Sequence, residues 1–149
     1  MDYETTPPQT FGLSLTGITV NLLCRDVLRE VAFLTRVFGL AVHRTSADFA
    51  IVTHGPAILQ LHSDATFARH PLYTLLPEAG PRGAGAEIRL HGIDPDAAGH
   101  RATRFPDAVL LASAADKPGH GLREAVILCP EGYAFVPSVA IKGAPSVTA

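Results

Sequence analysis

The pattern of hydrophobic and polar positions predicts a strand followed by a helix near the start of the chain. Residues 18–25, ITVNLLCR, have strand composition, with apolar side chains on alternate positions. Over residues 27–38 apolar side chains instead recur every three or four positions, as on one side of a helix. Asp26 is suited to cap the start of this helix, and Gly39 to end it. We therefore expect a strand, a tight turn and an amphipathic helix.

Three short extended runs follow the helix, at residues 40–45, 49–53 and 57–62. Turn-forming residues separate them, namely Ser46-Ala47-Asp48 and His54-Gly55-Pro56. The first half of the chain therefore reads as strand, helix and three strands.

The same order of elements returns in the second half. A strand is predicted at 86–91, and Asp94-Pro95-Asp96 provides a cap and a first-turn proline for a helix that we expect to reach Phe105. Three more strands are predicted, at 108–113, 122–128 and 133–139.

An internal repeat explains this symmetry. Asp26 and Asp94, which each end a strand and open a helix, lie 68 positions apart, and the same offset relates Thr19 to Glu87. A βαβββ unit of this size cannot bury both faces of its sheet alone. We expect two such units to pair, within one chain or across a dimer, into an α+β fold with a curved mixed sheet and helices outside.

The expected organisation has five parts. In order, they are a flexible N-terminal tail (1–16), a first βαβββ module (17–62), a proline- and glycine-containing linker (63–84), a second βαβββ module (85–140) and a C-terminal tail (141–149).

Composition and charge narrow the range of partners. Of the 149 residues, 47% are hydrophobic, and the net charge is −2 without any basic run, so we expect neither nucleic acid nor a membrane as partner. No apolar stretch is long enough to cross a bilayer, and the acidic start does not resemble a signal peptide, which favours a cytoplasmic protein. Cys24 and Cys129 lie in apolar strand-like segments and are expected to be buried, reduced thiols.

Three segments resemble the vicinal oxygen chelate superfamily, which contains glyoxalases, extradiol dioxygenases and bleomycin resistance proteins. They are ITVNLLCRDVLREVAFLTRVFGL, EIRLHGIDPDAA and ILCPEGYAFV, and the resemblance covers residues 17–138. In the last segment Cys129 stands where the family usually has Asp. The resemblance implies the glyoxalase/bleomycin resistance fold, with a cup on the concave face of the sheet.

The resemblance also implies four metal-ligand positions, which carry over to Thr19, Gln60, Glu87 and Val136. Metal-dependent members use His, Gln or Glu there, whereas valine has no lone pair to offer and threonine rarely serves as a ligand. A register shift of two would bring in Asn21 and His62, but Val136 or Ser138 would still complete the set poorly. We therefore expect no bound metal and no cofactor.

Strand parity indicates a polar cup. On three strands one face is apolar and the other polar, and the polar faces supply the expected ligand-binding residues Thr19, Asn21, Gln60, His62, Arg89 and His91, together with Glu87. Glu87 is the candidate catalytic base, and Arg89 the candidate contact for an anionic group. The alternative is that Glu87 forms an ion pair with Arg89 or Arg123, and that both histidines have structural or surface roles.

The sequence thus predicts a glyoxalase/bleomycin resistance-like protein that binds a small polar organic molecule, either sequestering it or carrying out metal-independent proton chemistry. Two alternatives stay open. One is a metal-dependent lyase or dioxygenase of the same superfamily, with Gln60, His62 or Glu87 essential; the other is an inert dimerisation module. If the protein is an enzyme, we expect a lyase, isomerase or dioxygenase of the glyoxalase type. We expect a homodimer as its assembly.

Overall fold

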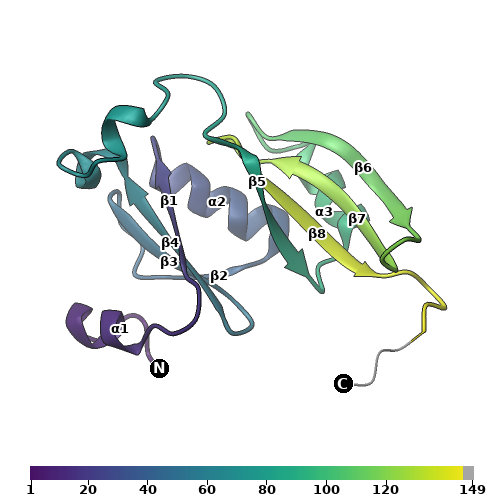
Figure 1. Ribbon diagram of the computed structural model, residues 1–149, viewed down its shortest axis with the longest axis horizontal. Coiled ribbons are helices and arrows are strands. Elements are labelled where there is room, and N and C mark those ends of the chain that lie inside the picture. Colours follow the sequence, from purple (N-terminus) through teal and green to yellow (C-terminus); the bar gives the residue numbers. More distant parts are fainter. Residues whose placement is uncertain (146–149) are drawn as a thin grey trace. The chain divides into compact units, whose positions relative to one another are not determined.

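The computed structural model describes residues 1–145, and for Ala84 its backbone alone (Figure 1). The chain divides into two compact units. The first contains Met1–Thr35 and Gly39–Glu78, and the second contains Arg36–Phe38 and the chain from Ala79 onward. The division falls inside the predicted linker 63–84. Residues 146–149 of the predicted C-terminal tail lie outside the described residues.

The first unit contains a four-stranded mixed sheet. Its strands are β1 (Val20–Cys24), β2 (Ala41–His43), β3 (Phe49–His54) and β4 (Ala57–Ser63), in the order β1-β4-β3-β2. β1 runs parallel to β4, while β3 is antiparallel to both of its neighbours. A parallel pair needs a long connection, and the helix that follows β1 begins that connection.

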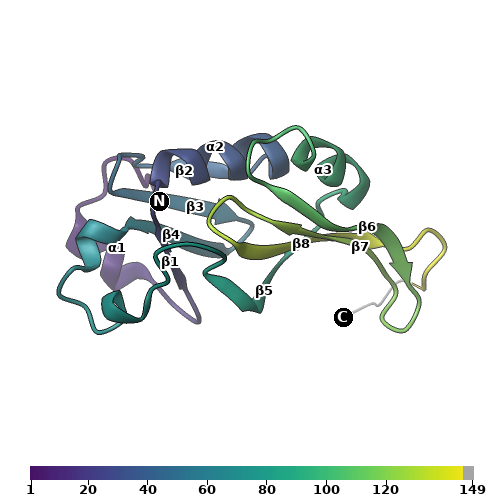
Figure 2. The same ribbon diagram turned by 90° about the horizontal axis from the view of Figure 1, so that it is seen from above.

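This helix, α2 (Val27–Phe38), forms as its sequence predicts. The Asp26 carboxylate accepts a hydrogen bond from the Arg29 backbone nitrogen at 3.0 Å, and Gly39 ends the helix with a φ of 69°. Phe33 and Leu34 are fully buried. Figure 2 shows that α2 covers one face of the sheet, while the N-terminal helix and the linker lie on the other side.

The N-terminal segment, expected to be a flexible tail over residues 1–16, contains the helix α1 (Pro8–Ser14). Phe11 is buried, and the Tyr3 ring lies 5.0 Å from the His43 ring. Glu4 accepts a 2.8 Å hydrogen bond from the backbone nitrogen of Arg44, whose φ of 50° is left-handed. These contacts attach the segment to the end of β2, and the sequence alone gave no periodicity that predicts them.

The second unit repeats the architecture of the first. It contains β5 (Gly83–His91), α3 (Pro95–Ala102), β6 (Val109–Lys117), β7 (Leu122–Leu128) and β8 (Tyr133–Ala140), with the strands in the order β5-β8-β7-β6. The Asp94 carboxylate accepts hydrogen bonds from the backbone nitrogens of Asp96 and Ala97, which confirms the predicted cap. The helix ends three residues before the predicted Phe105.

The predicted fold class is confirmed. The structure has two four-stranded mixed sheets in the same strand order and, within residues 1–145, three α-helices. The short 3-10 helices η1 (Asp64–Phe67) and η2 (Tyr73–Leu75) lie inside the predicted linker. α2 is the longest helix that the structure describes, at 12 residues, and none of the described helices has the length and apolar character to cross a bilayer.

A tight turn fixes the start of β8 against the chain that leads into β5. Gly132 has a φ of +86°, and a Cβ added there would lie 2.2 Å from the Pro81 Cα. The Gly83 backbone nitrogen donates to the Gly132 carbonyl at 3.2 Å. Backbone therefore passes so close to Gly132 that there is no room for a side chain.

This close approach predicts that Gly132→Ala destabilises the protein more than the same change at Gly121. Gly121 has a similar φ of +73° but open space around it, so Gly121→Ala carries only the backbone strain, about 1–2 kcal/mol. We expect Gly132→Ala to lower the free energy of unfolding by about 1–3 kcal/mol more, because the neighbouring backbone must move. Urea unfolding of both variants measures the difference, and equal losses would contradict the close approach.

Candidate functional site

One face of the second sheet carries the polar side chains that the sequence predicts for β5. Glu87, Arg89 and His91 alternate with Ile88 and Leu90, of which Leu90 is buried. Glu87 pairs in register with Ala134 of β8 and His91 with Ser138, so these residues share a face. We call it the polar face of the second sheet.

A chain of ion pairs crosses this polar face. Arg89 donates from Nη1 to the Glu87 Oε2 at 3.1 Å, and from Nη2 to the Oε2 of Glu124 on β7. The same Glu124 oxygen lies 3.2 Å from the Nε2 of His120, in the turn before β7. Side-chain exposure falls from 53% at Glu87 to 31% at Arg89 and 11% at Glu124. Arg89 therefore joins an exposed carboxylate to a nearly buried one.

These contacts control the ionisation of Glu124. Burial alone would raise the pKa of this carboxyl group, but the hydrogen bonds and charges of Arg89 and His120 together outweigh burial and hold its pKa below the ordinary 4.5. The bond to Glu124 in turn raises the pKa of Arg89. Both groups therefore stay charged at neutral pH.

A hollow of about 320 Å³ lies beside Glu87. Its lining is mostly apolar and comes from the start of β5 and from the three other strands; the lining residues are Pro81, Gly85, Ala86, Glu87, Leu111, Val126, Leu128 and Ala134. Glu87 is the one charged residue among the described residues that line it. The hollow therefore offers an apolar surface with a single carboxylate at its edge.

His91, at the end of β5, is bonded within the sheet. Its Nδ1 lies 3.1 Å from the hydroxyl of the buried Ser138, and the Gly92 backbone nitrogen donates to the Ser138 carbonyl at 2.8 Å. His91 does not line the hollow. A role for His91 in ligand binding stays a prediction.

The first sheet brings three of the predicted site residues together on one face. Asn21 of β1 pairs in register with Gln60 of β4, and His62 follows two positions along β4 on the same face. Asn21 is exposed and Gln60 is half-buried, and Thr19 lies one residue before β1. We call this the polar face of the first sheet, and ligand contacts from these residues also stay a prediction.

His62 is packed between two aromatic rings. The Phe49 ring lies 5.2 Å from the His62 ring, and the Phe67 ring of η1 lies 5.1 Å from it. The Nε2 atom of His62 is buried, and no residue among the described 1–145 bonds to it. Burial lowers the pKa of His62 below the ordinary 6.5, so the ring is neutral at physiological pH.

Two of the four metal-ligand positions that the sequence resemblance implies do not fit a metal ion. Val136 is fully buried and aliphatic, and it pairs in register with Arg89. Glu87 already bonds to Arg89, whose positive charge opposes a cation there. Within residues 1–145 no three His, Cys, Asp or Glu side chains are grouped so that they could hold a metal ion.

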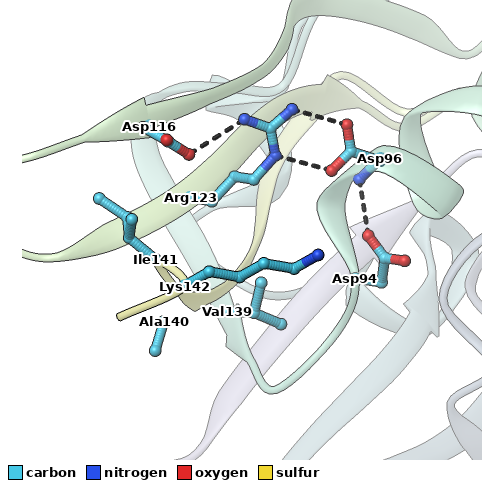
Figure 3. A pocket seen from close by; sticks show the side chains of 8 residues that line it. All are labelled: Asp94, Asp96, Asp116, Arg123, Val139, Ala140, Ile141 and Lys142. Carbon is cyan, nitrogen blue, oxygen red and sulfur yellow. Dashed lines mark hydrogen bonds and ion pairs between the residues drawn. The ribbon is translucent and has the colours of Figure 1, made fainter. Parts of the chain in front are cut away.

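A second hollow, of about 670 Å³, lies against the face of the second sheet that α3 covers (Figure 3). At its edge Arg123 donates from Nε and Nη2 to both oxygens of Asp96, at 2.7 and 2.8 Å, and from Nη1 to Asp116 at 3.0 Å. These bonds tie the first turn of α3 to β6 and β7. The sequence left Arg89 and Arg123 open as ion-pair partners of Glu87. Arg123 bonds to Asp96 and Asp116, and Glu87 bonds to Arg89.

Two residues near Glu87 were not predicted from the sequence. Glu124 and His120 were not selected, although Glu124 alternates with Val126 and Leu128 along β7, which is the signal of a shared face. β5 pairs with β8, and β8 pairs with β7, and this register places Glu124 on the same face of the sheet as Arg89. That pairing joins residues 35 positions apart and is not visible in local patterns.

Comparisons with known proteins identify the fold. No family model matches the chain, and no curated protein matches it. Among solved structures, the chain is similar to a glyoxalase/bleomycin resistance protein/dioxygenase family enzyme from Burkholderia phytofirmans PsJN, with 20% identity and a TM-score of 0.68 over 83% of this chain and 97% of that chain.

Two further solved structures agree. Lactoylglutathione lyase from Agrobacterium tumefaciens has 18% identity and a TM-score of 0.59, over 89% of this chain and 99% of that chain. TioX from Micromonospora sp. ML1 has 22% identity and a TM-score of 0.59, over 85% and 100%. At these identities the likeness concerns the fold. The chain therefore has the glyoxalase/bleomycin resistance fold that the resemblance in its sequence implied.

Proposed function

We propose that the chain binds a small organic molecule in the hollow beside Glu87. The observation that carries the proposal is the contrast between one half-exposed carboxylate and an otherwise apolar lining. Such a surface favours a ligand with an apolar body and one group that donates hydrogen bonds or carries positive charge. The sequence predicted a small polar ligand, and this lining favours an amphiphilic one.

Glu87 supplies the polar contact in this proposal, and Arg89 positions it. Arg89 holds the Oε2 atom of Glu87 and uses its other terminal nitrogen for Glu124, so both ends of its fork are engaged by carboxylates. Among the described residues 1–145 no hydrogen bond is made to the Oε1 atom of Glu87, so this atom is available to accept from a ligand. An anionic ligand would have to compete with Glu124 for Arg89, which disfavours the anion contact first expected from the sequence.

The same geometry supports sequestration and, for a ligand with an acidic C–H or N–H, proton transfer to Glu87 without a metal. The variant Glu87→Gln distinguishes these two functions. A loss of ligand binding alone indicates sequestration, whereas a loss of turnover indicates proton transfer. A glutamine side chain keeps a hydrogen-bond acceptor but can neither take up a proton nor attract a cation.

We predict that the hollow prefers amines over acids of the same shape. Benzylamine, benzyl alcohol and benzoate share an apolar ring and differ in their polar group. We expect binding to weaken in that order. We expect Glu87→Gln to weaken benzylamine binding about five- to tenfold, because glutamine keeps the hydrogen-bond acceptor but loses the negative charge that attracts the ammonium group. Ligand-observed NMR titrations measure these affinities.

Glu78→Gln is the matched control, because it makes the same chemical change at an exposed position of the linker. Its benzylamine affinity should equal that of the unmodified protein. A preference for benzoate would refute the proposal. So would benzylamine binding that is lost on chelation and restored by a divalent ion, because the proposed contact needs no metal.

A second prediction concerns the pKa of Glu124, which shares Arg89 with Glu87. In Arg89→Met the burial of Glu124 is opposed by His120 alone, so we expect the pKa of Glu124 to rise above its ordinary value. Arg123→Met, which removes an arginine from the opposite face, should leave the Glu124 pKa unchanged. The carboxyl carbon chemical shifts, followed by NMR as a function of pH, measure both.

The pH dependence of stability follows from the same shift. Because the pKa of Glu124 is lower in the folded chain than in the unfolded one, its network stabilises the fold above the ordinary pKa of 4.5, and the contribution is lost as the pH falls through the lowered pKa. Arg89→Met should reverse the sign of this dependence, which acid unfolding curves would show. An unchanged curve would mean that Arg89 does not control Glu124.

A further inference from the structure

The second hollow, which we call the Arg123 hollow, is the larger of the two described above, at about 670 Å³ against about 320 Å³ beside Glu87. Binding sites for small molecules usually have a volume of roughly 300–1,000 Å³. The lining of the Arg123 hollow, labelled in Figure 3, comes from the first turn of α3, the ends of β6 and β8 and the start of β7. It shares no residue with the lining of the hollow beside Glu87. The Arg123 hollow is therefore a separate candidate site within the second unit.

Arg123 itself is engaged by the protein. Its Nε and Nη2 atoms donate to Asp96, and its Nη1 atom donates to Asp116 (Figure 3). Each of its three nitrogens is thus bonded to a carboxylate, and an incoming anion would have to compete with both of them. Arg123 therefore holds the wall of the hollow in place, and the contacts for a ligand must come from other charged groups.

Two charged groups of the lining have no ion-pair partner within residues 1–145. The Asp94 Oδ1 atom accepts from the backbone nitrogens of Asp96 and Ala97, whereas its Oδ2 atom accepts no hydrogen bond from the described residues. The ammonium group of Lys142 is likewise not bonded to any described residue. Figure 3 shows the Lys142 side chain extending toward the side of the hollow on which Asp94 lies. Opposite charges therefore line one hollow without meeting each other.

The rest of the lining is apolar and selects a further part of the ligand. Val139 and Ile141, at the end of β8 and just after it, are both half-buried. An aliphatic group packed on them would be removed from water, which favours binding. The lining also has three carboxylates and only two cationic groups, which disfavours a ligand with negative charge alone. A suitable ligand has an aliphatic part and both charges.

We propose that the Arg123 hollow binds a free α-amino acid with an aliphatic side chain, the smallest kind of molecule with these three parts. Its ammonium group donates to the Oδ2 atom of Asp94, its carboxylate accepts from Lys142, and its side chain packs on Val139 and Ile141. The proposal goes beyond the binding proposed at Glu87, because the two hollows share no lining residue and either proposal can fail alone.

Three probes of one shape test the two charged contacts on the full-length chain. Leucine has both charges, 4-methylpentanoate lacks the ammonium group, and 3-methylbutylamine lacks the carboxylate. We expect leucine to bind most tightly and each of the others to bind roughly three- to tenfold more weakly, because one charged contact at a partly exposed site is lost. Protein-observed NMR titrations measure these affinities. The backbone amide signals of residues 139–142 report this hollow, and those of residues 85–87 report the hollow beside Glu87.

Two substitutions remove one charge each and preserve the local structure. Asparagine caps a helix as well as aspartate does, so Asp94→Asn keeps the cap of α3, and Lys142→Gln changes an exposed side chain. We expect each to weaken leucine binding roughly three- to tenfold. The matched controls are Asp26→Asn, at the cap of α2, and Lys117→Gln, at the other lysine of the chain. Both should leave the leucine affinity unchanged.

Three results would overturn the proposal. The first is that leucine moves no amide signal of residues 139–142. The second is that the three probes bind equally well at this hollow, because the two charges would then not select the ligand. The third is that the control variants weaken leucine binding as much as Asp94→Asn and Lys142→Gln do. Leucine binding should be unchanged in Glu87→Gln, which separates this proposal from the one at the other hollow.

Discussion

A four-stranded sheet with a single helix packed against it has only one face that the helix can bury. Both units of this chain obey that constraint. In the first, Leu22 and Leu61 pair in register and are buried, whereas the neighbouring pair Asn21 and Gln60 belongs to the opposite face. In the second, buried Leu90 alternates with Arg89 and His91. The second face of each sheet must therefore be covered by other parts of the chain, or carry polar groups that bond to one another or to water.

The two units satisfy this second face differently. In the first unit, other parts of the chain cover it, since the N-terminal segment packs Tyr3 against His43 and the linker packs Phe67 against His62. In the second unit the face is occupied by ion pairs, with Arg89 between Glu87 and Glu124. The first unit therefore places aromatic rings on this face, whereas the second places fixed charges beside a hollow. The duplicated architecture thus carries two kinds of surface.

Local patterns in the sequence predicted what depends on local physics. The caps at Asp26 and Asp94, the helix end at Gly39 and the alternation along β5 follow from neighbouring residues, and the structure has each of them. The helix α1 was not predicted, and neither was the contact of Glu4 with Arg44, because it joins residues 40 positions apart. Likewise, Glu87 was predicted as a site residue from the alternation along its own strand. Glu124 and His120 join the same chain of ion pairs only because of the register of three strands, which local patterns do not show.

Arg89 shows why the register matters for chemistry as well as for fold. Considered along β5 alone, an arginine two residues from a glutamate on a polar face is equally suited to hold an anionic ligand or to pair internally. The register adds a second carboxylate, Glu124, which is only 11% exposed. A nearly buried carboxylate without its arginine would carry a large desolvation cost, whereas the half-exposed Glu87 can exchange a partner with water at little cost. The ion pair of Arg89 with Glu124 therefore costs more to break than its ion pair with Glu87. The carboxylate of Glu87 is the group that can contact a ligand.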